Sequence, residues 1–469
     1  MTDAQKLDFL ISPEKYFPTE VSRGKLLGNV QFIESTVKYC DLLAESQYWE
    51  RKKIETIQVE RLRKLTGRIA LSSEFWSKTF IEHGFPVETA ALTDLCKLPV
   101  LDRTTIHKLG DALYVNPLLA DGDTYQRTSS GTTGIPLKLI YNEREMIIGF
   151  IALIFRHPVF EKINLAELLK RKPFVNLGMP GFWHICKDDF FERTFQSISV
   201  LDLEKPEVRR EIYKSIERAK PAILVGYASL IARLAYWVSK DNISLPLIAI
   251  RITSEPITLE EQGLIFKHLN APIVNMLSGN GTGFVGFECS GNLGKFHLNS
   301  ESMILETVDE HGSILKNGEE GELVISAFMF TLTPIIRYAH NDMGKIISEQ
   351  CVCGRTLPLF EFHGRRGYEI VLPDGKKLRM MHLYGVLWQN GLGKKSKQIQ
   401  IIQNSKNSLQ IIIVPRKPFS EYEEGGIYKS LAALFKENNM NFEIKYADSI
   451  SPGKGRKPCL FIPLSEYQQ

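Results

Sequence analysis

The sequence predicts an α/β fold for this chain of 469 residues, and three features favour that fold. Short apolar runs rich in Ile and Val, each the length of a β-strand, recur between residues 173 and 277. Segments with a helical pattern lie between several of these runs, as in folds whose helices cover a largely buried sheet. A second group of strands with one helix follows residue 397, which predicts a small α+β unit near the C-terminus.

The spacing of apolar residues places the individual elements. Residues 1–100 are expected to be mostly helical, since apolar side chains between Val30 and Leu65 recur three and four positions apart. Buried strands are expected at residues 173–179, 222–227, 245–253 and 271–277. Shorter, more polar strands that indicate a partly antiparallel region are expected at residues 321–328 and 334–339. The small unit should contain strands at residues 398–403, 408–415 and 442–449 and a helix at 422–437.

The loop HGRRG, residues 363–367, interrupts this pattern, and we place a domain boundary there. A large domain then covers residues 1–363, with the helical lead-in to about residue 100, and a small domain covers residues 364–469. The length of the chain is compatible with two or three domains.

The composition is that of an ordinary soluble protein, with 43% hydrophobic and 24% charged residues. The net charge of +4 gives no reason to expect nucleic acid or a membrane as the main partner. The apolar stretch at residues 147–155 is far shorter than the roughly 20 residues that span a bilayer. The first 18 residues lack the apolar core of a signal peptide, so we expect a cytoplasmic protein.

The most informative segment is QRTSSGTTGIPLKL, residues 126–139. Its backbone N–H groups, hydroxyls and glycines are suited to wrapping a phosphate. The residues concerned are Ser129, Ser130, Gly131, Thr132, Thr133 and Gly134. The Walker pattern is absent, which excludes an ordinary P-loop NTPase. By composition alone such a stretch is more often a plain surface loop, but Pro136 and Lys138 follow it in a specific order.

The string SSGTTGIPLK resembles the phosphate-binding motif of the adenylate-forming enzymes, which include acyl-CoA synthetases, adenylation domains and luciferases. Further segments resemble that superfamily's motifs in the same order: TSEPI, GEEGELVIS followed by PIIRYAHNDMGKI, GR at residues 364–365, and SPGKGRK at 451–457. Within the superfamily the chain most resembles the phenylacetate–CoA ligase type and its capsule-biosynthesis (CapK-like) relatives. Four segments carry that second resemblance: SSEFWSKTFIEHGFP, LTDLCKLPVLDRTTIHKL, FECSGNLGKFH and CVCGR. It extends from about residue 72 to residue 458.

The resemblance implies a large domain that binds ATP and a carboxylic acid, and a small mobile C-terminal domain. Such enzymes join the acid to the α-phosphate of ATP, release pyrophosphate and pass the acyl group to a thiol, usually coenzyme A. Developing charge on phosphate and carboxylate oxygens requires fixed donors and cations. The implied nucleotide contacts are Ser129, Ser130, Gly131, Thr133, Gly134, Lys138, Glu255, Ser278, Gly279, Thr282, Asp342 and Arg365, with Thr132 and Lys454 as catalytic residues.

Several of these residues have a simpler interpretation. Without the resemblance, Asp342 would be interpreted as a turn-forming aspartate. The resemblance instead implies that it binds the ribose hydroxyls. Glu255 alone reads as a solvated turn carboxylate, whereas the resemblance places it beside the adenine pocket. Lys454, between two glycines, reads by default as an exposed charge, with Lys457 as the fallback for its catalytic role. Trp183 and His184 lie where this branch builds its acid pocket, or they belong to an ordinary buried loop.

The segment SGNGTG, residues 278–283, departs from the superfamily. Ser278 stands where the family usually has the tyrosine that stacks on adenine, and Thr282 stands where it has the glutamate that holds Mg²⁺. Thr282 offers only a neutral hydroxyl, so Mg²⁺ binding should be weaker or use another carboxylate, with Glu288 and Glu301 as candidates. A second departure is Gly367, where the family's hinge commonly carries an acidic residue.

The seven cysteines of the chain form no disulfide framework, but three of them lie near one histidine in the sequence. Cys289 and His297 form one short pair, and Cys351 and Cys353 form another about sixty residues later. Spacing alone leaves a tetrahedral zinc site and four unrelated residues equally open. Some members of the resembled branch carry a structural zinc at this place, which favours zinc here.

The leading hypothesis is therefore an ATP-dependent ligase that makes an acyl-adenylate and then a coenzyme A thioester. A carrier protein or an amine is the alternative acceptor, and a homodimer is left open. An adenylyltransferase-like relative is the alternative enzyme. A catalytically silent homologue that binds nucleotide or a protein partner is the alternative from a different class, favoured by the SGNGTG departure.

Overall fold

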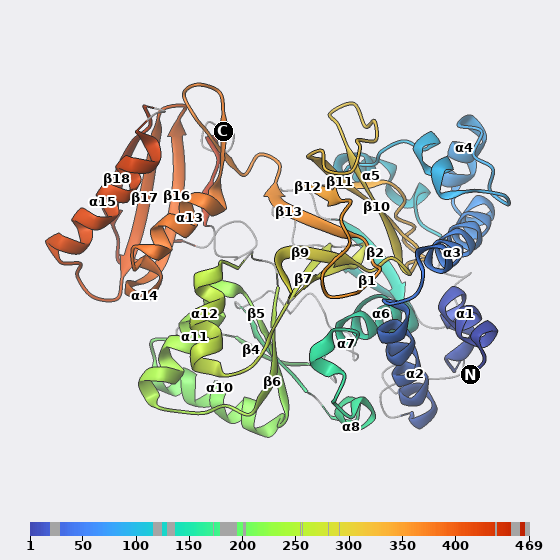
Figure 1. Ribbon diagram of the computed structural model, residues 1–469, viewed down its shortest axis with the longest axis horizontal. Coiled ribbons are helices and arrows are strands. Elements are labelled where there is room, and N and C mark those ends of the chain that lie inside the picture. Colours follow the sequence, from blue (N-terminus) through green and yellow to red (C-terminus); the bar gives the residue numbers. More distant parts are fainter. Residues whose placement is uncertain are drawn as a thin grey trace.

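The computed structural model describes residues 1–18, 29–115, 124–128, 137–171, 173–178, 195–199, 203–253, 255, 257–279, 281–289, 291–436, 439–451 and 460–464. It confirms the predicted α/β class. An eleven-stranded mixed sheet runs through the large part of the chain in the order β10-β11-β12-β13-β9-β8-β7-β6-β5-β3-β4. A separate four-stranded sheet lies at one end of the molecule, and the N-terminal helices lie at the other end (Figure 1).

The N-terminal part of the chain is helical, as predicted, and two helices cover the segment from Val30 to Leu65. Asn29 caps the N-terminus of α2 by accepting a hydrogen bond from the backbone N–H of Phe32. The break between α2 and α3 falls at residues 47–50. The elements are α1 Asp3–Ile11, η1 Pro13–Tyr16, α2 Val30–Ser46, α3 Arg51–Ser72, α4 Glu74–Glu82, η3 Leu92–Lys97, α5 Arg103–Leu109 and η4 Gly110–Ala112.

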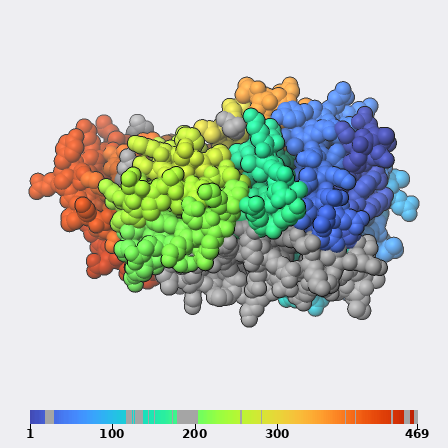
Figure 2. Space-filling model, turned by 90° about the horizontal axis from the view of Figure 1, so that it is seen from below, coloured from blue at the N-terminus to red at the C-terminus, as the bar shows by residue number. Residues whose placement is uncertain are grey.

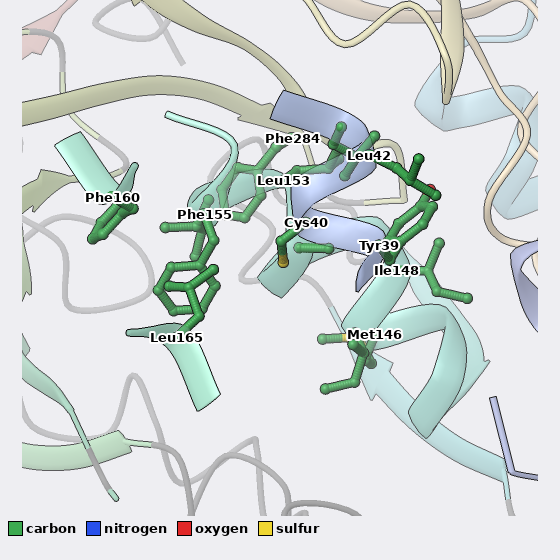
Figure 3. Close-up of a cluster of buried hydrophobic side chains, with 14 of the residues drawn as sticks. Tyr39, Cys40, Leu42, Met146, Ile148, Leu153, Phe155, Phe160, Leu165 and Phe284 are labelled. Atoms are coloured by element: carbon green, nitrogen blue, oxygen red, sulfur yellow. The ribbon is translucent and has the colours of Figure 1, made fainter. Parts of the chain in front are cut away.

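A hairpin and a helical segment follow. Strands β1 Thr124–Thr128 and β2 Lys138–Asn142 pair antiparallel with each other. The chain then turns through α6 Glu143–Met146, η6 Ile147–Ile151, α7 Ala152–Phe155, η7 Pro158–Phe160 and α8 Leu165–Leu169. Side chains of α2, such as Tyr39 and Leu42, pack beside those of this segment and beside Phe284 (Figure 3). The two segments lie side by side on the lower face of the molecule (Figure 2).

The parallel half of the large sheet contains the four buried strands that the sequence predicts. Its strands are β3 Phe174–Gly178, β4 Phe195–Ser199, β5 Ala222–Gly226, β6 Leu247–Ile252 and β7 Ile273–Gly279. Helices α10 Pro206–Arg218, α11 Ala228–Asp241 and α12 Leu259–Leu269 connect several of them. Alternate residues of β5 enter two separate cores, with Ile223 in one and Leu224 in the other. Burial on both faces explains why these strands read as continuous apolar runs.

The remaining strands of the large sheet are antiparallel, beginning with the pairing of β7 and β8. They are β8 Gly283–Cys289, β9 Asn292–Leu298, β10 Met303–Val308, β11 Gly321–Ala327, β12 Tyr338–Ile347 and β13 Leu359–Arg365. The strand predicted at residues 334–339 was placed too early, because β12 begins only at Tyr338. Pro334 lacks a backbone N–H, and Arg337 has a positive φ of 49°, so this segment does not continue a ladder.

The C-terminal sheet has the order β18-β17-β16-β19 and a core of its own, built from residues between Ile370 and Phe461. Its helix α15 Glu421–Phe435 starts with a capping box between Ser420 and Glu423. The other elements are β14 Glu369–Val371, β15 Lys377–Arg379, α13 Met380–Gln389, α14 Leu392–Lys395, β16 Ser396–Ser405, β17 Ser408–Pro415, β18 Asn441–Tyr446 and β19 Phe461–Ile462. None of the helices in the described ranges has both the length and the apolar character needed to cross a bilayer.

Candidate nucleotide and metal sites

The candidate nucleotide site lies where the parallel and antiparallel halves of the large sheet meet. There the chain reverses between β7 and β8, and Gly279 and Thr282 at this turn lie against His340 of strand β12. Asp342 on β12 lies opposite Arg365 on β13 in the sheet register. The Nε atom of Arg365 is 3.5 Å from Oδ1 of Asp342. Two residues that the sequence placed in one nucleotide site thus lie together in the structure.

Between Asp342 and the turn lies His340, which the sequence analysis did not identify. Asn341, between His340 and Asp342, has a positive φ of 63°, so β12 is irregular at this place. The Nε2 atom of His340 is 3.4 Å from the hydroxyl oxygen of Thr282, and its Nδ1 atom is 3.8 Å from Oδ2 of Asp342. A motif search by sequence misses this contact because Thr282, in the turn after β7, and His340, on β12, are 58 residues apart in the chain.

Burial sets the charges of these groups. Burial, with Arg365 and Arg103 nearby, lowers the pKa of His340 to about 3. Burial raises the pKa of Asp342 to about 6, although Arg365 acts to lower it. At neutral pH the imidazole is therefore neutral and the carboxylate is ionised. The pair offers one negative charge, held beside a guanidinium.

The phosphate loop, residues 129–134, lies outside the described residues, but the strands on both sides of it are described. Thr128 and Lys138 are paired across β1 and β2, so both ends of the loop are held at one place. The turn between β7 and β8 reaches this place, since a Cβ atom added at Gly281 would lie 3.1 Å from a methyl carbon of Leu139. The described strands that flank the loop therefore lie next to the turn that contacts His340.

Lys138, a predicted phosphate contact, has a protein partner in this structure. Its Nζ atom is 2.8 Å from Oδ1 of Asp111, a largely exposed carboxylate. The Tyr114 hydroxyl donates to the backbone carbonyl oxygen of Lys138, which fixes the start of β2. An exposed ion pair of this kind contributes little stability, so a phosphate can compete with Asp111 for the lysine.

Glu255 and Ser278 were also predicted to belong to the nucleotide site. One carboxylate oxygen of Glu255 accepts a hydrogen bond of 3.0 Å from the backbone N–H of Ser229, in the first turn of α11. A carboxylate at a helix N-terminus is stabilised by the helix dipole, which gives Glu255 a structural role in this structure. Ser278 is exposed on β7, and Gly279 follows it directly beneath the His340 ring.

The two carboxylates proposed as substitutes for the missing glutamate are engaged elsewhere. Glu301 is fully buried, and its oxygens lie 2.8 and 3.1 Å from the guanidinium of Arg156. Glu288 accepts hydrogen bonds from the backbone N–H of Gly294 and from the amide of Asn275. The expectation that Glu301 could hold Mg²⁺ is therefore wrong, because its charge is already neutralised inside the core.

The described side chains around the turn also fit Mg²⁺ poorly. They are the neutral hydroxyl of Thr282, the neutral imidazole of His340 and the carboxylate of Asp342, which is paired with Arg365. Mg²⁺ prefers an octahedron of hard oxygen ligands and is usually bound through carboxylates, substrate phosphates and water. Within the described part of the site, no chemical step is therefore assigned to a protein-bound magnesium ion.

The four predicted zinc ligands lie together in the structure. Their ligand atoms all lie within 4.8 Å of one another, although they come from β8, β9 and the loop before β13: Cys289, His297, Cys351 and Cys353. The sulfur atoms of Cys289 and Cys351 are 3.5 Å apart, and Nε2 of His297 is 3.2 Å from the sulfur of Cys353. Ligands of a tetrahedral zinc ion lie roughly 3.3–3.8 Å apart, so this donor set fits zinc.

The surroundings of the cluster suit a structural metal. Nδ1 of His297 is 3.3 Å from the backbone carbonyl oxygen of Leu357, which orients the ring so that Nε2 faces the sulfur atoms. Burial lowers the pKa of His297 to about 4, so the imidazole is in the neutral form that binds metal. The adjoining loop also holds the break between α2 and α3, since Arg355 and Thr356 bind Gln47.

Other predicted site residues lie outside the described residues. They are Ser129, Ser130, Gly131, Thr132, Thr133 and Gly134 of the phosphate loop, Trp183 and His184 of the acid pocket, and Lys454 and Lys457 near the C-terminus. Their roles stay predictions from the sequence.

Comparison with known proteins identifies relatives with similar sequences. No family model matches the chain. Protein CapK of Staphylococcus aureus is 24% identical over 303 residues, a match that covers 62% of this chain and 63% of CapK. A phenylacetate-coenzyme A ligase of Thermus thermophilus is 23% identical over 317 residues, covering 65% of this chain and 68% of the ligase. The match therefore spans less than two thirds of CapK.

Solved structures share the fold over most of the chain. A 2-hydroxyisobutyryl-CoA ligase, in the postadenylation state with R3-HIB-AMP, has a TM-score of 0.66 at 15% identity. That match covers 89% of this chain and 93% of the ligase. The same ligase with 2-HIB-AMP and CoA, in its thioesterification state, has a TM-score of 0.53 at 16% identity over the same shares. The chain is thus similar in sequence to CapK and to a phenylacetate-coenzyme A ligase over part of its length, and it shares the fold of the 2-hydroxyisobutyryl-CoA ligase.

Proposed function

We propose that the protein uses ATP to convert a carboxylic acid into an acyl-adenylate and then passes the acyl group to coenzyme A. The observation that carries this proposal is the meeting of three predicted nucleotide elements in space. Asp342 and Arg365 are paired, Gly279 and Thr282 of the turn lie against His340 on the same strand as Asp342, and the strands that flank the phosphate loop reach the same turn. The 2-hydroxyisobutyryl-CoA ligase with the same fold binds an acyl-AMP and CoA, which supports both steps.

In this proposal each site residue either holds a part of the substrates in place or balances the negative charge of the phosphates and carboxylates. Asp342 accepts hydrogen bonds from the ribose hydroxyls, and Arg365 neutralises the Asp342 carboxylate while reaching toward ribose or phosphate. Ser129, Thr132, Thr133 and Lys138 hold the β- and γ-phosphates, and Lys454 bridges the substrate carboxylate and the α-phosphate. Mg²⁺ accompanies the nucleotide phosphates, without a carboxylate at position 282 to hold it. Trp183 and His184 line the acid pocket.

The small domain is proposed to begin at residue 364 and to move during the cycle. Two glycines with positive φ angles, Gly364 at +100° and Gly367 at +81°, border the proposed hinge. In this structure Arg416 of the small domain binds Glu204 of the large domain, with 2.7 Å between nitrogen and oxygen. A carrier protein or an amine remains the alternative acceptor, and a homodimer and a cytoplasmic location remain predictions.

The second candidate is a silent homologue that binds nucleotide without activating an acid. The neutral turn favours it, because Ser278 supplies no stacking ring and Thr282 supplies no carboxylate. Pyrophosphate release with ATP, Mg²⁺ and a panel of carboxylic acids separates the two candidates. Acid-dependent release supports the ligase or an adenylyltransferase-like relative. Retained ATP binding without release for any acid supports the silent homologue.

The phosphate loop gives a prediction for ATP binding. Thr132→Val and Lys138→Ala should each weaken ATP binding by roughly 1–3 kcal/mol, since each removes one donor or cation from the phosphate site. Isothermal titration calorimetry measures the effect. Asp111→Asn is the matched control, because it releases Lys138 from its ion pair and should leave ATP binding equal or slightly stronger. Unchanged ATP affinity in both site variants would indicate that the nucleotide binds to another part of the protein.

We further propose that Cys289, His297, Cys351 and Cys353 bind one structural zinc ion. All four positions of the tetrahedron are then filled by protein ligands, which leaves no position for substrate. The metal would hold the loop of residues 351–356 against the break between α2 and α3, where Thr356 binds the backbone carbonyl oxygen of Gln47. Its role would be stability, with no direct part in the chemistry.

The zinc proposal predicts a metal content and a stability change. Protein purified without chelator should contain about one zinc ion per chain, measured by mass spectrometry of the metal. Cys351→Ser should lower both the metal content and the melting temperature, because metal binding is coupled to folding of the loop. Cys96→Ser serves as the control, since Cys96 is exposed and is not one of the four clustered residues. Metal-free protein with unchanged stability would contradict a structural zinc.

A further inference from the structure

His340 lies between Thr282 and Asp342 in the candidate nucleotide site, and it approaches a different oxygen of the Asp342 carboxylate than Arg365 does. Arg365 Nε approaches Oδ1 at 3.5 Å, and His340 Nδ1 approaches Oδ2 at 3.8 Å. The closest approaches of Arg365 and His340 are thus to different oxygens of the carboxylate. A carboxylate held from both sides cannot rotate freely, which matters if its two oxygens must meet two adjacent ribose hydroxyls.

The surroundings fix the imidazole in this place. Gly279 lies directly beneath the ring, and a Cβ atom added there would be only 1.7 Å from Cε1 of His340. The ring of Tyr338 packs edge-on against the imidazole, with 4.5 Å between the centroids. The side chain of His340 is 7% exposed. A glycine at position 279 is therefore required for the histidine to reach its position.

The charges of the neighbours favour one tautomer of the neutral ring. An ionised carboxylate only accepts hydrogen bonds, so the imidazole is most stable with its single hydrogen on Nδ1, facing Asp342. Nε2 then accepts from the hydroxyl of Thr282, 3.4 Å away. Because 3.8 Å is longer than a hydrogen bond, the attraction between Nδ1–H and Asp342 is that of a dipole and a charge. In a buried site such attraction is stronger than in water.

We propose that His340 is a positioning residue that enforces recognition of the ribose hydroxyls by orienting the carboxylate of Asp342. The inference rests on the proposed function, in which Asp342 binds the ribose. It explains why a neutral histidine is buried between a threonine and an aspartate at the centre of this site. It also assigns Gly279 a purpose, since any side chain there would displace the imidazole.

The test compares the binding of ATP and 2′-deoxy-ATP by calorimetry. The wild-type protein should bind ATP more tightly, and His340→Ala should reduce that preference about tenfold. His340→Asn places an amide nitrogen near the position of Nδ1, so it should restore most of the preference. His340→Gln places its amide near Nε2, out of reach of Asp342, and should behave like the alanine variant. Gly279→Ala should also lower the preference, because it moves the ring.

The outcomes separate this inference from the proposed function. Loss of the preference in Asp342→Asn together with an undiminished preference in His340→Ala would overturn the role of His340 and leave the ribose role of Asp342 standing. Equal affinities of the wild-type protein for ATP and 2′-deoxy-ATP would instead contradict the ribose assignment itself. So would an Asp342→Asn variant that keeps the wild-type ratio of these two affinities. If His340→Ala does not fold, the His340→Asn and His340→Gln variants test the inference. Equal ratios of ATP affinity to 2′-deoxy-ATP affinity in these two variants would overturn it.

Discussion

Lys454→Ala should slow adenylate formation at least about a hundredfold, which corresponds to about 2.7 kcal/mol of lost transition-state stabilisation. In the proposed reaction a carboxylate attacks the α-phosphate, so two negatively charged groups must approach each other. A lysine between them lowers this repulsion only where the charges meet, and its effect therefore appears in the chemical step. The glycines on both sides, Gly453 and Gly455, give the loop room to enter a narrow site.

The measurement is single-turnover formation of AMP-linked product with saturating ATP and acid. ATP binding should be retained, and so should transfer from supplied acyl-adenylate to coenzyme A, because the lysine acts only in adenylation. Lys457→Ala is the matched control on the same loop. If Lys457→Ala is inactive and Lys454→Ala is normal, the alignment of the loop is wrong. Full activity in both variants would contradict the C-terminal resemblance.

Glu301→Gln should lower the free energy of unfolding by about 3–5 kcal/mol, because it leaves Arg156 charged in the core without its partner. Both side chains of the pair are 0% exposed. The guanidinium also donates to Asn299 and to the backbone carbonyl oxygen of Leu43, and Glu301 accepts from Ser46. The pair therefore joins α2, α7 and the segment before β10. Urea denaturation measures the change.

The same pair predicts a dependence on pH. Burial alone would raise the pKa of Glu301, but Arg156 and Ser46 hold the pKa below its ordinary value. A carboxyl with a lowered pKa stabilises the fold above its unfolded pKa of about 4.3, and the contribution is lost as the pH falls through the folded pKa. The wild type should therefore lose more stability than Glu301→Gln between neutral pH and acid.

Two further variants test whether the unpaired charge of Arg156 causes the loss of stability in Glu301→Gln. Glu45→Gln removes a carboxylate from an exposed ion pair with Lys6 and should change stability by less than about 1 kcal/mol. The double variant Arg156→Met with Glu301→Leu removes both charges and should recover much of the loss. The Mg²⁺ dependence of ATP binding should be the same in Glu301→Gln as in wild type. A changed Mg²⁺ dependence would instead support Glu301 as a ligand of Mg²⁺.

The fold could be predicted from the sequence where burial makes a strong pattern. Strands such as β5 are buried on both faces, so they read as short runs of Ile, Val and Leu between helical segments. The start of β12 was misplaced because PIIR is as apolar as a strand, although Arg337 has a positive φ and binds the buried Glu306. Apolar character alone does not distinguish a buried connection from a strand.

The site shows the same limit more sharply. The four metal-binding candidates could be predicted because cysteine and histidine are rare and carry a specific chemistry. His340 could not, because its importance comes from Thr282 and Gly279, which lie about sixty residues earlier in the chain. Glu301 was misjudged for a related reason. A carboxylate read from sequence looks available for metal, and only the fold reveals the buried arginine beside it.

The most direct test of the central claim is mass-spectrometric detection of an acyl-adenylate. The purified protein is incubated with ATP, Mg²⁺ and a mixture of aryl, fatty and hydroxy acids, in the absence of coenzyme A. The proposed function predicts a product whose mass equals AMP joined to one of the acids with loss of water, and its absence with Asp342→Ala. ATP bound by the wild-type protein without an adenylate of any acid in a broad panel would contradict the claim and favour a silent nucleotide-binding homologue.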